Sequence, residues 1–455
     1  MGNFINEKYI NSLLSNKATN SDINHILQKA SRHEGLTHQD VAALLTTTDD
    51  EHIQSIFNIA GCIKKHIYGD RIVLFAPLYV SDYCINNCTY CGFKAGSGQK
   101  RRKLTQDEVR RETAILQEMG HKRLVIEAGE DPVNCSLDYI LECITTIYNT
   151  SFDNGETRRV NVNIAALDEH GYKRLKNANI GTYILFQETY HRATYEEVHI
   201  AGPKSDYDYH ISAFERAMAA GIDDVGAGVL FGLHDYKYEV LALMLHNEHL
   251  EKHFGVGFHT ISVPRIVGGK HPYAVSDQDF LKLVAILRLA VPFTGMIIST
   301  RETPQMRRKL VQIGVSQMSA GSSTTVGGYA AVGSHTGSAN SQQFTLSDHR
   351  GANEIIYWLM EEGILPSFCT ACYRKGRNGD RFMGLAKNGD IKNICLPNGI
   401  LTLKEYALDY GDTRFKALSD HLISEKLANI NNEKTRELIQ LKLSSLTQGE
   451  RDLFI

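Results

Sequence analysis

Short apolar runs rich in β-branched residues alternate with helical stretches between residues 71 and 323. Eight such runs occur, at residues 71–80, 122–129, 158–167, 182–189, 223–233, 259–266, 295–302 and 315–323. The stretches between them place apolar residues at helical spacing, as in QDEVRRETAILQEMG and DQDFLKLVAILRLA. Eight strand–helix repeats predict an α/β fold closed into a (β/α)8 TIM barrel. An open doubly wound sheet uses the same elements, but no Gly-rich phosphate fingerprint follows the first run.

Helical patterns flank the predicted barrel on both sides. Four amphipathic segments, each behind a plausible polar cap, fill the first seventy residues. From about residue 349 onward the strand signal stops and helical patterns return. We therefore predict three parts, namely an N-terminal helical extension (1–70), the barrel (71–348) and a C-terminal helical domain (349–455).

Composition and charge narrow the classes of function. The 455 residues include 49 Lys and Arg against 52 Asp and Glu, a formal charge of −3, with no basic tail or stripe. Nucleic acid is therefore not an expected partner. The sequence has no signal-peptide pattern and no apolar run of membrane-spanning length. We expect a cytoplasmic protein without a membrane partner, whose nine cysteines stay reduced and are available as ligands rather than paired in disulfides.

Three cysteines lie in the loop after the first predicted strand, in YCINNCTYCGF. Cys84, Cys88 and Cys91 have the spacing C-x3-C-x2-C, and the C-terminal ends of barrel strands are where active sites form. A closed structural metal site usually takes four protein ligands. Three thiolates therefore favour a [4Fe–4S] cluster with one iron left open to a bidentate amino acid. The alternative is a zinc knuckle, which requires a fourth Cys or His that the loop does not contain.

A second triplet, Cys369, Cys372 and Cys395, lies near the C-terminus with the spacing C-x2-C-x22-C. Soft thiolates suit a second iron–sulfur cluster. A Cys3His zinc site has the same ligand types, and spacing alone leaves both possibilities open. The three remaining cysteines fall in helical or loop stretches, where we expect them to be packing residues.

These motifs resemble the radical S-adenosylmethionine (SAM) superfamily. The segments KRLVIEAGEDP, RRVNVNIAAL, GIDDVGAGVLFGL, HTISVPRI and STRETP further resemble its tyrosine lyases. SFCTACYRKGRNGDRFM, with Cys395 beyond it, resembles the branch of those lyases that matures [FeFe]-hydrogenase. The resemblance implies a radical SAM barrel followed by a C-terminal domain that carries an auxiliary iron–sulfur cluster.

The resemblance also implies roles for individual residues. The first triplet would hold the [4Fe–4S] cluster that reductively cleaves SAM, with Tyr90 shielding it and lying near a bound base. Gly129 and Glu130 stand where the superfamily has a GGE-like motif that receives the methionine amino group. The candidates for contacts with the SAM ribose and carboxylate are Asn163, Glu188 and Arg192.

The family's substrate is L-tyrosine, which is cleaved at Cα–Cβ to p-cresol and dehydroglycine. A free amino acid needs a cation for its carboxylate, and both Arg301 and Arg265 follow predicted strands, with Arg301 preferred. For Arg265 a salt bridge to Glu302 is the alternative. The second triplet would hold an auxiliary [4Fe–4S] cluster with an extra iron, to which His259 is assigned by the resemblance.

On that auxiliary cluster dehydroglycine would become CO and cyanide, forming an Fe–CO–CN precursor of the hydrogenase H-cluster. A low-potential electron donor and a maturation scaffold GTPase are the partners that the resemblance implies. One alternative is a one-cluster tyrosine lyase that supplies dehydroglycine for thiazole synthesis. Another is a non-catalytic metal-binding module, which an intact first triplet on a complete barrel disfavours.

Overall fold

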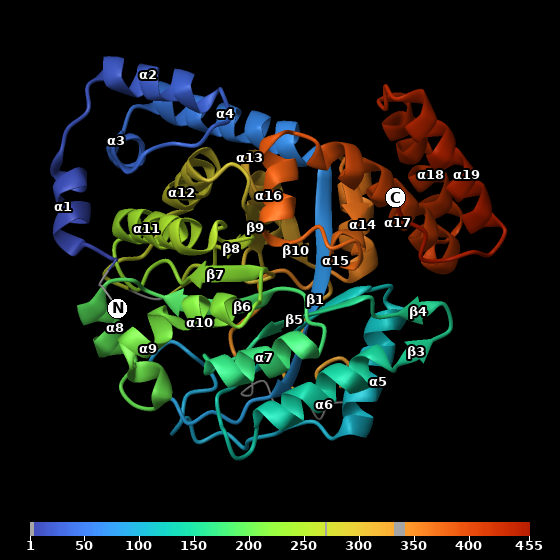
Figure 1. Cartoon of the computed structure of the whole chain (residues 1–455), viewed down its shortest axis with the longest axis horizontal. Helices are drawn as coiled ribbons and strands as arrows, with labels where there is room; N and C mark the ends of the chain where they lie inside the picture. The colour runs from blue at the N-terminus through green and yellow to red at the C-terminus, as the bar shows by residue number, and fades with distance from the viewer. Residues whose placement is uncertain (1–3, 269–270, 332–341) are drawn as a thin grey trace.

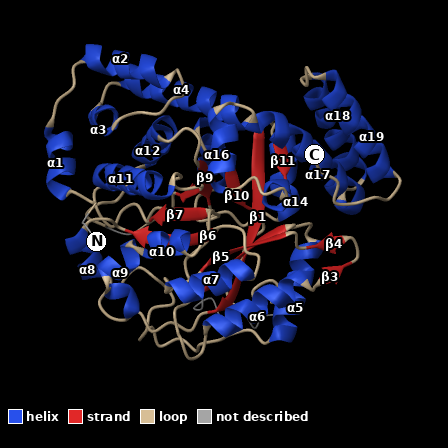
Figure 2. Cartoon of the chain, in the orientation of Figure 1, coloured by secondary structure: helices blue, strands red, loops and turns tan. Residues whose placement is uncertain are grey.

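A closed parallel barrel forms the centre of the computed structural model, which describes residues 4–268, 271–331 and 342–455. Strands pair in the order β10-β9-β8-β7-β6-β5-β2-β1, and β10 pairs back onto β1. Their bounds are β1 (Arg71–Ser81), β2 (Arg123–Ala128), β5 (Arg159–Asn163), β6 (Tyr183–Glu188), β7 (Val225–Val229), β8 (Thr260–Ser262), β9 (Gly295–Ile298) and β10 (Gln317–Ser319). All eight predicted strands and the predicted closure are confirmed, and helices surround the strands in Figure 2.

Strand β1 is longer than any other described strand, as Figure 1 shows, and it pairs with three neighbouring strands. Its start pairs with β11 (Leu365–Ser367), its middle with β10 and its end with β2. Ten of its eleven residues are buried, because one part faces the barrel interior and the other faces the covering helices. An apolar run without alternation is the expected sequence of such a strand.

Strand β11 corrects the prediction that strands end near residue 349. It is parallel to β1, with Arg71 opposite Leu365 and Val73 opposite Ser367. Three residues that include Pro366 are too short to show a strand period, and proline usually indicates an edge or a turn. Strand β11 therefore depends on its pairing with β1, which is distant in sequence, and no local pattern indicated it. A short antiparallel pair, β3 (Ser151–Phe152) and β4 (Gly155–Glu156), was also missed.

The four predicted N-terminal helices are confirmed, and they cover one side of the barrel (Figure 1). Capping boxes at Thr19 and Thr37 start two of them, as their sequences indicate. Their bounds are α1 (Glu7–Ser15), α2 (Asn20–Ala30), α3 (His38–Thr46) and α4 (Asp50–Tyr68). Helix α4 packs on α12 (Asp277–Ala290) and α13 (Pro304–Ile313) of the barrel.

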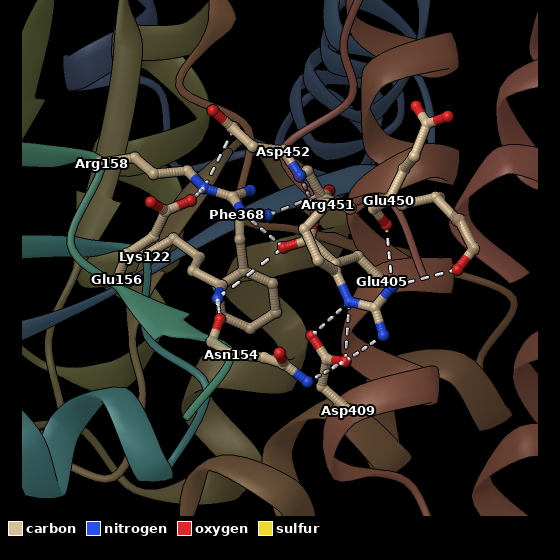
Figure 3. Close-up of polar contacts among 12 residues, drawn as sticks. Lys122, Asn154, Glu156, Arg158, Phe368, Glu405, Asp409, Glu450, Arg451 and Asp452 are labelled. Carbon is tan, nitrogen blue, oxygen red and sulfur yellow. Dashed lines mark hydrogen bonds and ion pairs between the residues drawn. The ribbon is translucent and has the colours of Figure 1, made fainter. Parts of the chain in front are cut away.

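The C-terminal part is helical apart from β11. Its helices are α14 (Ala352–Glu361), α15 (Ala371–Arg374), α16 (Gly379–Lys387), α17 (Ile391–Tyr410), α18 (Thr413–Ala428) and α19 (Glu433–Thr447). Helix α17 packs on β11, on α4 and on both following helices. Polar contacts in Figure 3 join the last residues of the chain to α17 and to the start of the barrel strands. The three-part division of the chain stays a prediction. None of the described helices is long and apolar enough to cross a membrane.

A fully buried ion pair secures the segment that closes the barrel. Arg307 on α13 pairs with Asp348, and neither side chain is exposed. Removing one partner leaves the other charge buried and uncompensated, which costs about 3–5 kcal/mol. We therefore expect Asp348→Ala to lower the free energy of unfolding by roughly that amount. Urea unfolding measures this change. Asp107→Ala is the matched control, because its exposed pair with Arg110 contributes about 0–1 kcal/mol; equal effects would contradict the expectation.

Candidate active site and a second cysteine site

The first cavity opens at the C-terminal ends of the barrel strands and encloses about 220 Å³. Its wall includes all three cysteines of the first triplet, which come from the loop after β1. The residues from the sequence prediction that line it are Cys84, Cys88, Tyr90, Cys91, Gly129, Glu130, Asn163, Glu188 and Arg301. Closure of the barrel thus brings these residues from the ends of five strands, β1, β2, β5, β6 and β9, around one cavity.

The cysteine loop is held in place by the end of β2. The amide of Ile85 donates to the carbonyl of Glu130 at 2.8 Å, and the Asn86 side chain donates to the Glu130 carboxylate at 2.6 Å. A Cβ at Gly129 would lie 2.3 Å from the carbonyl oxygen of Tyr83. Only glycine allows this close approach. The loop is therefore already shaped before any ligand binds.

Two thiols of this loop, those of Cys88 and Cys91, are enclosed and neutral. Burial raises the pKa of Cys88 to about 12 and that of Cys91 to about 11, while the nearby Lys204 charge acts in the opposite direction. Cluster or metal binding requires the thiolate form and releases the proton. Within the described residues no three His, Cys, Asp or Glu side chains lie close enough to hold one metal ion. A [4Fe–4S] cluster binds each cysteine through a different iron, so its ligands need not converge on one point.

Tyr79, Glu127 and Asn163 form a polar row across three neighbouring strands, since they stand opposite one another in the sheet register. The Asn163 side chain donates to the Glu127 carboxylate at 2.8 Å. Burial raises the pKa of Glu127 to about 8, and Asn163 acts weakly against this. Glu127 is therefore neutral at pH 7 and can donate a hydrogen bond into the cavity. Sequence analysis missed it, although its alternation with Val125 on β2 indicates an inward position.

Glu188 ends β6 in an unusual backbone conformation, with φ at 67° and an irregular strand register beside it. Its carboxylate pairs with Lys204 at 2.8 Å. The backbone amide of Lys204 in turn donates to the Asn86 side chain at 2.9 Å, which connects this pair to the cysteine loop. Lys204 lies in a turn after α8 (Arg192–Val198), where no local pattern identified it.

Tyr90 lies between the cysteines and a buried histidine. Its hydroxyl lies 2.8 Å from Nε2 of His199, whose Nδ1 contacts the carbonyl of Tyr195 at 2.8 Å. Burial and the Lys204 charge lower the pKa of His199 to about 3, so the ring is neutral. The Tyr90 hydroxyl therefore donates to Nε2, and the contact fixes the ring beside Cys88 and Cys91.

Arg301 projects into the cavity and has no carboxylate within salt-bridge distance among the residues that the structure describes. Its guanidinium lies over the ring of Phe344 at 4.0 Å, and its Nε is buried without a hydrogen-bond partner. Burial lowers its pKa, but a guanidinium stays charged at neutral pH. An unpaired cation in an enclosed cavity is suited to a carboxylate ligand.

Two predicted site residues lie elsewhere. Arg265 does not line the cavity, because its guanidinium pairs with Glu302 at 2.8 and 2.9 Å and with Asp277 at 2.6 Å. Arg192 pairs with Asp208 on the exposed side of α8. For Arg265 the structure has the salt bridge that the sequence left as an alternative. Neither guanidinium is oriented toward the first cavity, so their predicted contacts with substrate and SAM have no support in this geometry.

The second cavity lies at the opposite, N-terminal ends of the strands. It encloses about 60 Å³ and is lined by Cys369, Cys372, Cys395 and His259. Strand β11 leads directly to Cys369, α15 carries Cys372, and α17 carries Cys395. The second triplet and its predicted histidine therefore share one pocket, as the resemblance implied.

Several buried polar atoms in this pocket have no hydrogen-bond partner among the described residues. They are Nε of Arg71, Nε of Arg123, Oδ1 of Asp224, Nδ1 of His259 and Oγ1 of Thr370. Buried polar groups are ordinarily satisfied, so each such atom requires an explanation. Three thiols among these arginines fit an anionic iron–sulfur group.

His259 stands just before β8, with its Nδ1 3.5 Å from Oδ1 of Asp224. A carboxylate behind a ligand histidine orients its ring. The structure does not bring His259 and the three cysteines close enough to hold a single ion.

Comparisons with known proteins agree with this architecture. A model of the Radical SAM superfamily matches residues 78–246, and one of the Biotin and Thiamin Synthesis associated domain matches residues 262–365. A crystal structure of HydG, a maturase of the [FeFe]-hydrogenase, is 54% identical and covers 100% of both chains with a TM-score of 0.96. HydG from Carboxydothermus hydrogenoformans is 39% identical over 96% of each chain, with a TM-score of 0.82. The 2-iminoacetate synthase of Escherichia coli K12 is 28% identical over 75% of this chain and 89% of its own length.

The barrel and the cysteine loop at its rim define a radical SAM enzyme. With identity of 54% over its whole length, the chain belongs to the HydG family of [FeFe]-hydrogenase maturases. The family resemblance and the fold class that the sequence predicted are thereby confirmed.

The raised pKa of Glu127 predicts how the free energy of unfolding depends on pH. Its pKa is 4.5 in the unfolded chain and about 8 in the folded one, so its contribution to stability is lost as pH rises through this range. We expect Glu127→Gln to gain stability relative to the parent between pH 5 and pH 8, by up to roughly 1.4 kcal/mol per pH unit. Urea unfolding at several pH values measures the difference. Glu118→Gln, at an exposed position, is the control; a difference independent of pH would contradict the expectation.

Proposed function

We propose that this enzyme cleaves L-tyrosine at Cα–Cβ to p-cresol and dehydroglycine. The second triplet is then required to convert dehydroglycine to CO and cyanide, which form an Fe–CO–CN precursor of the hydrogenase H-cluster. The observation that carries the proposal is one barrel with two cysteine-lined cavities at its opposite ends. The HydG relatives support the context of hydrogenase maturation. The relatives named 2-iminoacetate synthase support the first product, since 2-iminoacetate is dehydroglycine.

The residues of the first cavity fit a [4Fe–4S] cluster with SAM. When bound to Cys84, Cys88 and Cys91, the cluster supplies the low-potential electron that cleaves SAM. The carboxylates of Glu130 and Glu188 provide acceptors for the ammonium and hydroxyl groups of SAM. The preshaped cysteine loop holds these acceptors at fixed positions, which reduces the ordering cost of binding.

Arg301 would bind the carboxylate of tyrosine. Its guanidinium is charged, unpaired in the described part of the chain and oriented into the cavity, while Phe344 fixes its plane at 4.0 Å. Bidentate contact with a carboxylate gives both affinity and orientation. The apolar walls of the cavity, including Phe75, Phe93 and Ile184, exclude water and suit an aromatic ring.

The second triplet distinguishes two candidate functions. A one-cluster lyase that stops at dehydroglycine is the second candidate, favoured by the match to 2-iminoacetate synthase over 345 residues. The second cavity, in which buried arginine Nε atoms lack hydrogen-bond partners among the described residues, favours the two-site function. A low-potential electron donor and a scaffold GTPase complete the proposed system as partners.

Replacing Cys369 and Cys372 with Ala separates the two functions. In an anaerobic assay with SAM, tyrosine and dithionite, the parent should form both p-cresol and CO that haem traps. The double variant should keep p-cresol and lose CO, because the first cavity lies at the other end of the barrel. Cys62→Ala is the matched control, since Cys62 lines neither cysteine cavity. Formation of p-cresol without CO by the parent would favour the one-cluster lyase, and loss of p-cresol by a folded double variant would contradict the division of roles.

Arg301→Ala should raise the KM for tyrosine about 30- to 4,000-fold, because loss of a charge-assisted contact costs about 2–5 kcal/mol. Arg301→Lys should restore part of the loss through its remaining charge. Steady-state p-cresol formation measures both variants. Arg110→Ala, in an exposed ion pair, is the control. An unchanged KM in Arg301→Ala would exclude this residue as the carboxylate partner.

A further inference from the structure

Residues 450–455, here termed the tail segment, return from α19 across α17 to the turn after Cys372. Figure 3 shows Arg451 and Asp452 of this segment beside Asp409 and Glu405 of α17. Arg451 contacts Asp409 on α17 through Nε at 2.8 Å and Nη2 at 2.6 Å. The Asp409 side chain is 2% exposed. This bidentate contact is shielded from solvent on one side, unlike an ordinary surface ion pair.

Asp452 connects three parts of the molecule. Its backbone amide donates to the Glu405 carboxylate on α17 at 2.8 Å. Its own carboxylate pairs with Arg158, which precedes β5, at 3.0 Å, and with Arg374 at the end of α15. Arg158 and Glu405 are 5% and 4% exposed and pair with each other at 2.6 Å. The tail segment therefore joins the barrel rim, the helix that carries Cys395 and the turn after Cys372.

The end of the tail segment reaches the pocket itself. The amide of Ile455 donates to the Asn398 side chain at 2.8 Å, and the Ile455 carbonyl accepts from Nη2 of Arg377 at 2.9 Å. Arg377 lines the second cavity beside the three thiols. Its Nε is buried and has no partner among the described residues. One edge of this guanidinium is thus held by the tail segment.

A second contact fixes the same turn. Phe454 lies under the guanidinium of Arg374 at 4.2 Å and near Nζ of Lys375 at 5.3 Å. The amide of Arg377 donates to the carbonyl of Cys372 at 2.9 Å, so the turn cannot move without moving a cluster cysteine. Contacts with the tail segment therefore act on Cys372 through both backbone and side chains.

We propose that the tail segment positions Arg377 as a cationic partner of the metal group bound by Cys369, Cys372 and Cys395. Thiolates that converge in a buried pocket need nearby positive charge. Arg71 and Arg123 begin strands and are held by the barrel. Arg377 lies in a short turn, and among the described residues its guanidinium donates a hydrogen bond to the tail segment alone. The identity of the metal group rests on the proposed function, but the positioning role does not.

The test uses full-length protein with Cys84, Cys88 and Cys91 replaced by Ala, so that iron reports the second site alone. Three changes are compared in this background: Arg377→Ala, Arg377→Lys and a chain that stops after Gly449. The readouts are iron bound per chain after anaerobic reconstitution, the EPR spectrum and the reduction potential of the reduced cluster. Lys404→Ala is the matched control, because it removes the ion pair between Lys404 on α17 and Asp420 on α18 without touching the tail segment.

The shortened chain and Arg377→Ala should each weaken iron binding about tenfold, as when outer partners of metal ligands are removed. Both should change the EPR spectrum and the potential in the same direction, and combining them should add little. Arg377→Lys should restore part of the potential. Circular dichroism and the unfolding midpoint verify folding, and Asp452→Asn provides a milder variant if the shortened chain misfolds.

The proposal would be overturned if the folded shortened chain kept the iron content, EPR spectrum and reduction potential of the parent. If the shortened chain misfolds, the same result in folded Asp452→Asn would overturn it. So would a loss in Arg377→Ala that the shortened chain does not share. Failure of the proposed function has a different signature. Zinc in place of iron at the second triplet of the parent would refute the two-cluster function, and metal content across the same variants would still report whether the tail segment positions the site.

Discussion

Both candidate sites depend on strand β1, which extends beyond the barrel wall at one end and carries the cysteine loop at the other. Its first residues pair with β11, which leads to Cys369, and its last residue lies three positions before Cys84. Hydrogen bonds to β2, β10 and β11 place all four strands in one sheet. The separation of the two triplets is therefore a property of the sheet and not of a linker.

The two ends of the barrel also differ in charge. The carboxylates of Glu130 and Glu188 line the first cavity beside Lys204 and Arg301, whereas Arg71, Arg123 and Arg377 line the second. The first set suits a ligand with ammonium and hydroxyl groups, and the second suits an anionic group bound by thiolates. Under the proposed function, each end of the barrel would hold the reactant whose charge it complements.

Local sequence patterns predicted elements that are defined by their own residues. Every barrel strand and N-terminal helix was visible as an apolar period with caps or turns around it. Strand β11 was not, because Leu365–Ser367 is stabilised by its pairing with β1 and not by any period of its own. Lys204 and Arg377 were missed for a related reason, since each lies in a turn and is defined by residues distant in sequence.

The sequence by itself determined the barrel and the presence of two cysteine triplets, because strand periodicity and ligand spacing are local properties of the chain. Only the tertiary structure decided that the triplets lie at opposite ends of the barrel. It also separated the two candidate arginines, of which the sequence preferred Arg301, since Glu302 neutralises Arg265 while Arg301 faces the cavity. Both outcomes depend on which charged side chains the fold brings into contact. Burying a charge without a partner is unfavourable, so the pairing of buried charges is specific to the folded structure.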